Sequence, residues 1–521
     1  MKKFYIFLFF YCFITTNSLS QNWVRTFSNG ALVAVHWVIE TYDHGYITLC
    51  NQNPPGYLWL IKTDINGNKL WEKKIGAGSY SIVFWNIAQT SDGGYILTGG
   101  FNKYDINNQD PVLIKLNACG ELDWCSVIHT QGRYDFATRC KQTSEGEYVM
   151  LTMYSDPHYI VNLFKFDWNG NLLWKRNYRP DSLIFDEEPW DVRVDPDGYL
   201  ISGKCYYPDP NNPNIGWERP YFIKTDTSGN LTWWLVYGSI SGYHGYSWDA
   251  IQKSSTGNYY SFVVHSNYCD TPGFVKVLSD GTQSYNHDLL NGLCPGGYWG
   301  SLNFVDDTTL ITHAYSTVAS QNIHKWLLLD TLGNLKLSKD YPSWIDGTAH
   351  TANARDRKFI SVAQVNDYWL YLYKLNADLN YDSIYTHQYV YDSLCSGGVI
   401  SDTIDPDCDL IVGIDEYSSR SEASQLRVYP DPATSSVTIE FPNYLQLVDK
   451  KLGMTTVSNF YQWDATMLEV FDQQGKMIYS RQIPKNQLIL QVDVSDWVRG
   501  MYYFKLQFKN RDVSGRKLIL K

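Results

Sequence analysis

The chain has 521 residues, of which 44% are hydrophobic, and this content argues against global disorder. It contains 41 Tyr and 19 Trp, residue types that favour strands, so we expect an all-β protein. The formal net charge of -11 argues against nucleic-acid binding, because an acidic surface repels phosphate backbones.

The N-terminus has the features of a secretory signal peptide. Lys2 and Lys3 precede an apolar run from Phe4 to Ile14, and Ser18-Leu19-Ser20 follows as a small-x-small site. We therefore predict a signal peptide over residues 1–20, with the mature chain starting at Gln21. The apolar run is too short to remain as a membrane span, so we predict no transmembrane segment.

Two landmarks then recur about every 50 residues. The first is a polar turn before an aromatic strand, as in Asp92-Gly93-Gly94-Tyr95. The second is an apolar strand, a turn and a strand carrying Trp, as in Ile61-Lys62-Thr63-Asp64 through Gly67 to Trp71. Asn and Gly tolerate the positive φ of tight hairpins, so each unit should hold two hairpins, or four short strands.

One such sheet cannot bury both of its faces alone, whereas a ring of copies can. Seven copies therefore predict a seven-bladed β-propeller over residues 21–412. Asn22 to Phe27 resembles the fourth strand of a unit and should complete the last blade. The alternative is eight blades, because Asp405 to Gly413 echoes Asp195 to Gly203 as half of a further unit.

Composition changes after the repeats. Residues 413–425 are polar and Ser-rich, as in a linker, and residues 426–521 contain short alternating strands. We expect a small Ig-like β-sandwich there. Residues Tyr444 to Trp463 have the character of an insertion into it.

This C-terminal stretch resembles the type A C-terminal sorting domain of cargo proteins of the Bacteroidetes type IX secretion system. The resemblance rests on ordered motifs, in which Asp431 replaces the usual Asn. The motif residues are Tyr429, Pro430, Asp431, Pro432, Asp472, Gly475, Gly500, Tyr502, Lys517 and Lys521. It implies that the outer-membrane machinery is a partner and that the protein is secreted or attached to the cell surface.

The repeat units resemble secreted bacterial propeller repeats that share the Asp-Gly-Gly-Tyr turn. That resemblance concerns architecture, because one fold serves many functions. Nine of the 10 cysteines follow the signal segment, and oxidising conditions after export favour pairing. The sequence-near pairs are Cys119 with Cys125, Cys269 with Cys294, and Cys395 with Cys408, and the odd number leaves one thiol over.

No catalytic motif is visible, and no residue is assigned as catalytic, cofactor-binding or metal-binding. The Asp64 to Asn68 loop superficially suggests calcium, but a hairpin turn explains its residues. Trp85, Trp190 and Trp248 are candidates for stacking on a ligand if they line the channel, and blade-to-blade core packing is the alternative. We therefore predict a non-enzymatic binding or structural propeller with a glycan or protein ligand. The alternative is a secreted, glycosidase-like hydrolase with its site in the channel.

Overall fold

The computed structural model describes residues 23–520 except 53–55, 105–107, 130–133, 156–158, 179–184, 210–211, 237–243, 267–269, 289–300, 319–320, 341–348, 412–426, 430–432, 442–443, 450–453, 460–465, 473–475, 485–486, 488 and 509–510. The described residues form strands β1 to β39 and no helix, which confirms the all-β prediction. None of them belongs to a helix that could cross a membrane. The predicted signal peptide and linker lie outside the described residues. The chain divides into two compact units between Ile411 and Val412.

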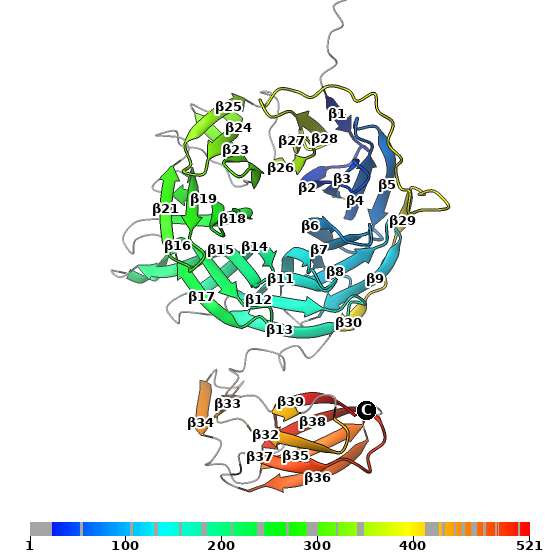
Figure 1. The fold of residues 1–521 in the computed structure, drawn as a ribbon, viewed down its shortest axis with the longest axis vertical. Coiled ribbons are helices and arrows are strands. Elements are labelled where there is room, and N and C mark those ends of the chain that lie inside the picture. The colour runs from blue at the N-terminus through cyan, green and yellow to red at the C-terminus, as the bar shows by residue number, and fades with distance from the viewer. Residues whose placement is uncertain are drawn as a thin grey trace, which may run out of the picture. The chain divides into compact units, whose positions relative to one another are not determined.

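The first unit contains seven small antiparallel sheets, which we call blades 1 to 7 (Figure 1). Blade 1 consists of β2 (Val33–Glu40), β3 (Tyr46–Gln52), β4 (Tyr57–Thr63) and β5 (Lys69–Ile75). Blade 2 consists of β6 (Ile82–Gln89), β7 (Tyr95–Phe101), β8 (Asp110–Leu116) and β9 (Leu122–Ile128). Blade 3 consists of β10 (Phe136–Gln142), β11 (Tyr148–Ser155), β12 (Tyr159–Phe166) and β13 (Leu172–Tyr178). Blades 4 and 5 consist of β14 (Phe185–Asp195), β15 (Gly198–Asp209), β16 (Asn212–Thr225) and β17 (Leu231–Val236), then β18 (His244–Lys253), β19 (Tyr259–Ser266), β20 (Asp270–Val277) and β21 (Gln283–Asp288). Blade 6 consists of β22 (Leu302–Asp306), β23 (Thr309–Val318), β24 (Gln321–Asp330) and β25 (Leu335–Asp340).

Blade 7 takes strands from both ends of the repeat region. Its strands β26 (Ala349–Ala354), β27 (Lys358–Val365) and β28 (Trp369–Leu375) are completed by β1 (Val24–Phe27), which pairs with β28. The innermost strand of each blade contacts that of the next, from β2 and β6 round to β26 and β2. The blades therefore form a seven-membered ring, as the repeat count predicts, and β1 closes it as expected.

Apolar residues fill the space between neighbouring blades. Leu49 and Leu60 of blade 1 pack in one cluster with Ile87 and Leu97 of blade 2, all fully buried. Burial of apolar surface between sheets is the main stabilising contribution in such a ring, because each thin sheet leaves both faces open by itself.

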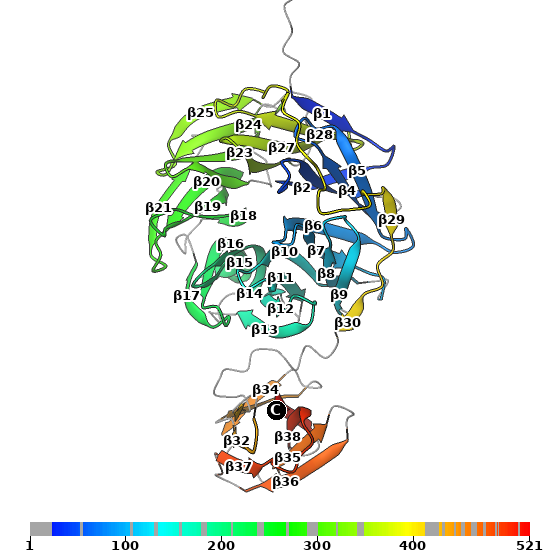
Figure 2. The same cartoon turned by 45° about the vertical axis from the view of Figure 1, so that its right-hand side comes forward.

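Residues 376–411, which we call the strap, leave blade 7 and cross the outside of blades 1 and 2 (Figure 2). Within the strap, β29 (Asp402–Ile404) adds in parallel to β5, and β30 (Asp409–Ile411) adds in parallel to β9. The segment that begins at Asp405 therefore forms part of the strap rather than an eighth blade. Its likeness to Asp195 to Gly203 reflects a strand of similar composition in a different pairing.

Two disulfides join the strap to blade 2. They connect Cys119 with Cys395 and Cys125 with Cys408. The predicted pairs Cys119–Cys125 and Cys395–Cys408 are therefore wrong. Both cysteines of the first pair belong to blade 2 and both of the second to the strap, and each bonds across to the other segment because the strap lies against the blade. Cys269 and Cys294 lie outside the described residues. Among the described residues, Cys50 and Cys140 are buried free thiols.

The second unit is a sandwich of two sheets. One has the order β31 (Arg427–Tyr429), β32 (Ser436–Glu440), β37 (Ile489–Asp493), and the other β36 (Met477–Ile483), β35 (Thr466–Asp472), β38 (Gly500–Phe508), β39 (Arg511–Leu520). Side chains such as Ile439, Leu468 and Phe504 form its core. Strands β33 (Tyr444–Asp449) and β34 (Met454–Asn459) form a separate hairpin, which agrees with an insertion in this part of the sequence.

Candidate functional site

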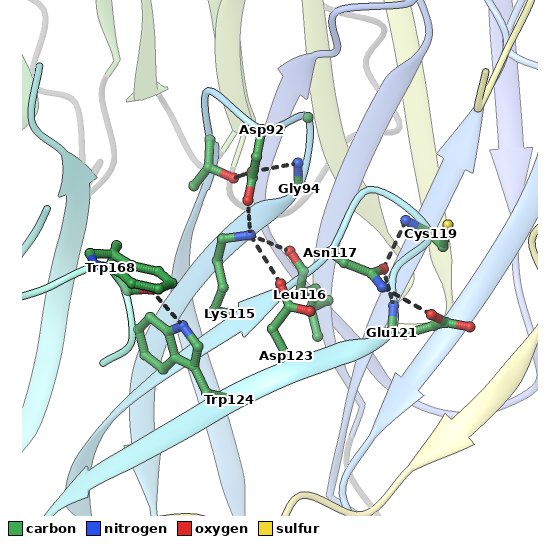
Figure 3. Close-up of polar contacts among 12 residues, drawn as sticks. Asp92, Gly94, Lys115, Leu116, Asn117, Cys119, Glu121, Asp123, Trp124 and Trp168 are labelled. Atoms are coloured by element: carbon green, nitrogen blue, oxygen red, sulfur yellow. Dashed lines mark hydrogen bonds and ion pairs between the residues drawn. The ribbon is translucent and has the colours of Figure 1, made fainter. Parts of the chain in front are cut away.

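The repeated Lys and Asp residues of the motif form ion pairs within the blades. Lys115 Nζ lies 2.8 Å from Asp92 Oδ2, and Asp92 Oδ1 accepts a hydrogen bond from the Gly94 amide (Figure 3). Burial is the largest influence and opposes ionisation of Asp92, but the hydrogen bonds from Lys115, Thr90 and the Gly94 amide together outweigh it and lower the pKa of the carboxyl. Lys62 pairs with Asp43 at 2.8 Å in the same way. These charged residues therefore stabilise the turns of blades 1 and 2.

The repeated Trp joins neighbouring blades at several of their junctions. The indole N–H of Trp124 donates to the carbonyl of Trp168 at 3.2 Å (Figure 3), and Trp23 donates to the carbonyl of Ile65 at 3.1 Å. Gly170 sits beneath the Trp124 ring with a φ of +84°, and a Cβ there would lie 2.6 Å from that ring. One packing contact between blades therefore requires both the Gly and the Trp of the motif.

The turn that suggests calcium is closed by its own hydrogen bonds. Asp64 Oδ1 accepts the amides of Asn66 and Asn68, each at 2.8 Å. Within the described ranges, no three His, Cys, Asp or Glu side chains are placed to hold a metal ion. The carboxylate of Asp64 acts as a turn cap.

The innermost strands carry β-bulges at equivalent positions. The pairing shifts between Val35 and Trp37 in β2 and between Phe84 and Asn86 in β6, which makes His36 and Trp85 the extra residues. A bulge re-aims its side chain out of the regular alternation, and bulges are common next to binding sites. Both bulged residues are therefore candidate ligand contacts.

His36 and Trp85 belong to an aromatic cluster where blades 1, 2 and 3 meet. Their rings contact edge to face with centroids 4.8 Å apart, and the Trp85 ring lies 6.0 Å from that of Phe136. Tyr134, whose ring lies 6.2 Å from Phe136, is 48% exposed. We call His36, Trp85, Tyr134 and Phe136 the aromatic cluster.

A cation lies beside this cluster. The Arg139 guanidinium is 4.3 Å from the centroid of Trp37, and the His350 ring stacks on Trp37 at 3.8 Å. Arg139 also pairs with Asp191 of blade 4 at 3.4 Å. Burial, followed by the charge of Arg139, lowers the pKa of His36 to about 4 and that of His350 well below its ordinary value. Both imidazoles are therefore neutral at pH 7.

The three Trp candidates are not brought together. Trp85 is half-buried in the aromatic cluster, whereas Trp190 is 9% exposed and packs with Tyr260 and Phe262 between blades. Trp248 lies in β18, and its side chain is outside the described residues.

Sequence reasoning missed His36, Arg139 and His350. A signal for the first was present, because His36 and Trp85 each stand ten residues before the turn tyrosines Tyr46 and Tyr95.

Four of the described sorting-motif residues, Asp472, Gly500, Tyr502 and Lys517, lie in the four-stranded sheet of the sandwich. Asp472 ends β35 and accepts the Lys476 amide at 2.9 Å, and Gly500 begins β38 with a φ of +155°. Tyr502 is buried, and Lys517 pairs with Tyr503 in the register of β38 and β39. Tyr429 lies in β31, while Pro430, Asp431, Pro432, Gly475 and Lys521 are outside the described residues.

Comparison with known proteins identifies the second unit. Residues 427–521 match the family described as the secretion system C-terminal sorting domain. No curated protein matches the chain.

Solved structures resemble the chain only distantly. A protein of unknown function from Bacteroides caccae has 14% identity and a TM-score of 0.34, over 59% of this chain and 97% of that one. A polysaccharide lyase, an ulvan lyase, has 9% identity and a TM-score of 0.47, over 68% and 96%. The α-L-arabinanase of Penicillium chrysogenum has 10% identity and a TM-score of 0.40, over 68% and 99%. We draw no argument about activity from likenesses of this degree.

Proposed function

Because residues 427–521 form a sorting domain that makes this chain a cargo of the type IX secretion system, we propose that its propeller is a non-enzymatic module that binds glycan outside the cell. The sorting domain supplies the route to the cell surface or the medium. The propeller supplies the surface that acts there, at the aromatic cluster.

The observation that carries this proposal is the aromatic cluster itself. Trp85 is placed on a bulge, is only half-buried, and has His36 on one side and Phe136 on the other. Tyr134 adds a half-exposed phenol beside it. Aromatic faces of this kind stack on the apolar faces of sugar rings, and a phenol can also hydrogen-bond to a hydroxyl.

The charges beside the cluster favour binding over the alternative of a secreted hydrolase. Glycoside hydrolysis needs two carboxylic groups, of which one acts as acid and the other as base or nucleophile. The carboxylate of Asp191 is instead paired with Arg139. His36, with a pKa of about 4, is a weak base at neutral pH.

Calorimetric titration of the full secreted chain with neutral cello-, manno- and galacto-oligosaccharides tests the proposal. We expect binding to at least one of them, and Trp85→Ala should raise its Kd about two- to tenfold, since aromatic stacking contributes roughly 0.5 to 1.5 kcal/mol. Trp168→Ala is the matched control, because Trp168 is 70% exposed on a turn outside the cluster.

The same oligosaccharides should be recovered uncleaved. Release of reducing ends by the wild-type chain would refute the proposal that the propeller is not an enzyme. A Kd that Trp85→Ala leaves unchanged would refute the site.

A further inference from the structure

The outer face of the four-stranded sheet in the sandwich carries an exposed apolar row. The register pairs Met477 of β36 with Phe471 of β35, and Phe471 with Tyr503 of β38. Residues directly opposite in neighbouring strands share a face, so these three side chains lie side by side. Met477 is 51% and Tyr503 47% exposed, and Phe471 between them is half-buried.

The neighbours of this row along each strand point the other way. Val470, Tyr502 and Phe504 are buried in the core of the sandwich. Because alternate residues of a strand face opposite sides, the row belongs to the solvent side of the sheet. Its composition is therefore not explained by the core of its own domain.

The other sheet of the same domain shows what an ordinary solvated face looks like here. On β32 and β37 the register pairs Ser436 with Asp493 and Thr438 with Gln491, and all four are polar. Tyr, Phe and Met are enriched where proteins bind proteins, and an apolar group rimmed by polar residues is typical of such surfaces. Lys505 and Glu469, paired next to the row, supply a polar rim, with Lys505 Nζ 5.7 Å from the Phe471 ring.

The row also lies among the sorting-motif residues. Asp472 follows Phe471 directly in the sequence, Gly475 stands two positions before Met477, and Tyr503 follows Tyr502 and pairs with Lys517. We propose that the row Met477–Phe471–Tyr503 is the surface by which a protein of the secretion machinery reads the sorting domain. This inference rests on the export route stated above and names the surface through which it acts.

Export of the full chain in a bacterium that carries the type IX machinery tests the row. The variant Met477→Glu/Tyr503→Glu should lower the surface and medium fraction at least about tenfold, with the chain accumulating in the periplasm, as loss of a few central contacts does at interfaces. The matched control Ser436→Lys/Gln491→Glu changes two residues on the polar face and should be exported as the wild type is.

Folding is checked separately, because a misfolded tail would also stall. Met477→Thr/Tyr503→Thr keeps β-propensity while removing the apolar surface, and its melting temperature should match that of the wild type. Loss of export with an unchanged melting temperature supports the row, and normal export of both row variants overturns it.

A chain that ends at Ser424 separates this inference from the export assignment. If that chain stalls while the row variants reach the surface, the row is wrong and the export route stands. If the shortened chain also reaches the surface, the assignment of the sorting domain fails and the inference fails with it.

Discussion

Single residues in this protein take their roles from where a repeat places them. Gly170 accepts the Trp124 ring of the neighbouring blade, and Asp92 is ionised beside Lys115 to close a turn. His36 and Trp85 occupy the same bulge in two blades, yet one is titratable and the other is not. The bulge is the position where the repeat varies, so that is where binding specificity is expected.

His36 should make stability depend on pH. Its pKa in the folded chain is about 4, below its ordinary value of 6.5, so the unfolded chain binds more protons between these pH values. The free energy of unfolding should therefore fall as pH drops from 6.5 to 4, by about 2 kcal/mol after allowance for solvent screening.

His36→Gln should remove this part of the slope in urea unfolding measured across that range. His387→Gln, at an exposed position of the strap, serves as the control and should keep the slope. A slope identical in all three chains would contradict the role assigned to His36.

At the level of elements, the strap is the feature that distinguishes this propeller from a bare ring. It begins after blade 7, and Asp392 accepts the Trp71 indole N–H at 3.1 Å. Asp402 pairs with Lys73 at 2.8 Å, and the strap ends with Ile411 accepting the His129 amide. It therefore spans the junction at which the ring closes and covers the rim edges of β5 and β9, which would otherwise offer unpaired backbone groups.

Removing both strap disulfides should destabilise the propeller strongly. Cys119–Cys395 and Cys125–Cys408 span 276 and 283 residues, and the chain-entropy model gives about 5 kcal/mol for loops of that length. A variant with all four changed to Ser should lose several kcal/mol of unfolding free energy in guanidinium under oxidising conditions.

Reduced wild-type chain provides the comparison, and it should unfold at the same denaturant concentration as the oxidised variant. If the oxidised wild type and the variant unfold together, the disulfides contribute nothing and the strap is held by its hydrogen bonds.

For the propeller as a whole, closure depends on a short strand. Val24 to Phe27 pair with β28, and Trp23 beside them is fully buried, with its indole N–H donating to the Ile65 carbonyl. A few residues from the start of the repeat region thus complete a sheet whose other strands come from its end.

Trp23→Ala should therefore destabilise the whole ring, by roughly 3 to 5 kcal/mol as for other buried large-to-small changes. Thermal unfolding and limited proteolysis of the purified chain measure this effect, and cleavage should appear across several blades. Trp168→Ala, at an exposed turn, should change neither the melting temperature nor the proteolysis pattern. Cleavage confined to residues near Val24 would show that β1 is a local addition and not the closure.

The sequence predicted the elements better than it predicted the site. The all-β class, the seven blades and the completion of the last blade by an N-terminal strand follow from turn residues and aromatic strands, which are local signals. The disulfides were mispredicted because Cys119 and Cys395 are distant in sequence, and no local pattern records such a contact. The aromatic cluster was found only through Trp85, since His36 and Phe136 meet it from the two neighbouring blades.

The sequence by itself therefore determined the repeat, its hairpins and the motifs of the sorting domain, because these depend on residues within a few positions of one another. Only the tertiary structure decided the course of the strap, the partners of its cysteines and the neighbours of His36 and Trp85. It also decided which face of the sandwich is left apolar. The physical reason is that these features depend on contacts between strands that are distant in sequence. One local pattern is compatible with many different contacts of this kind, and only the folded ring and sandwich select among them.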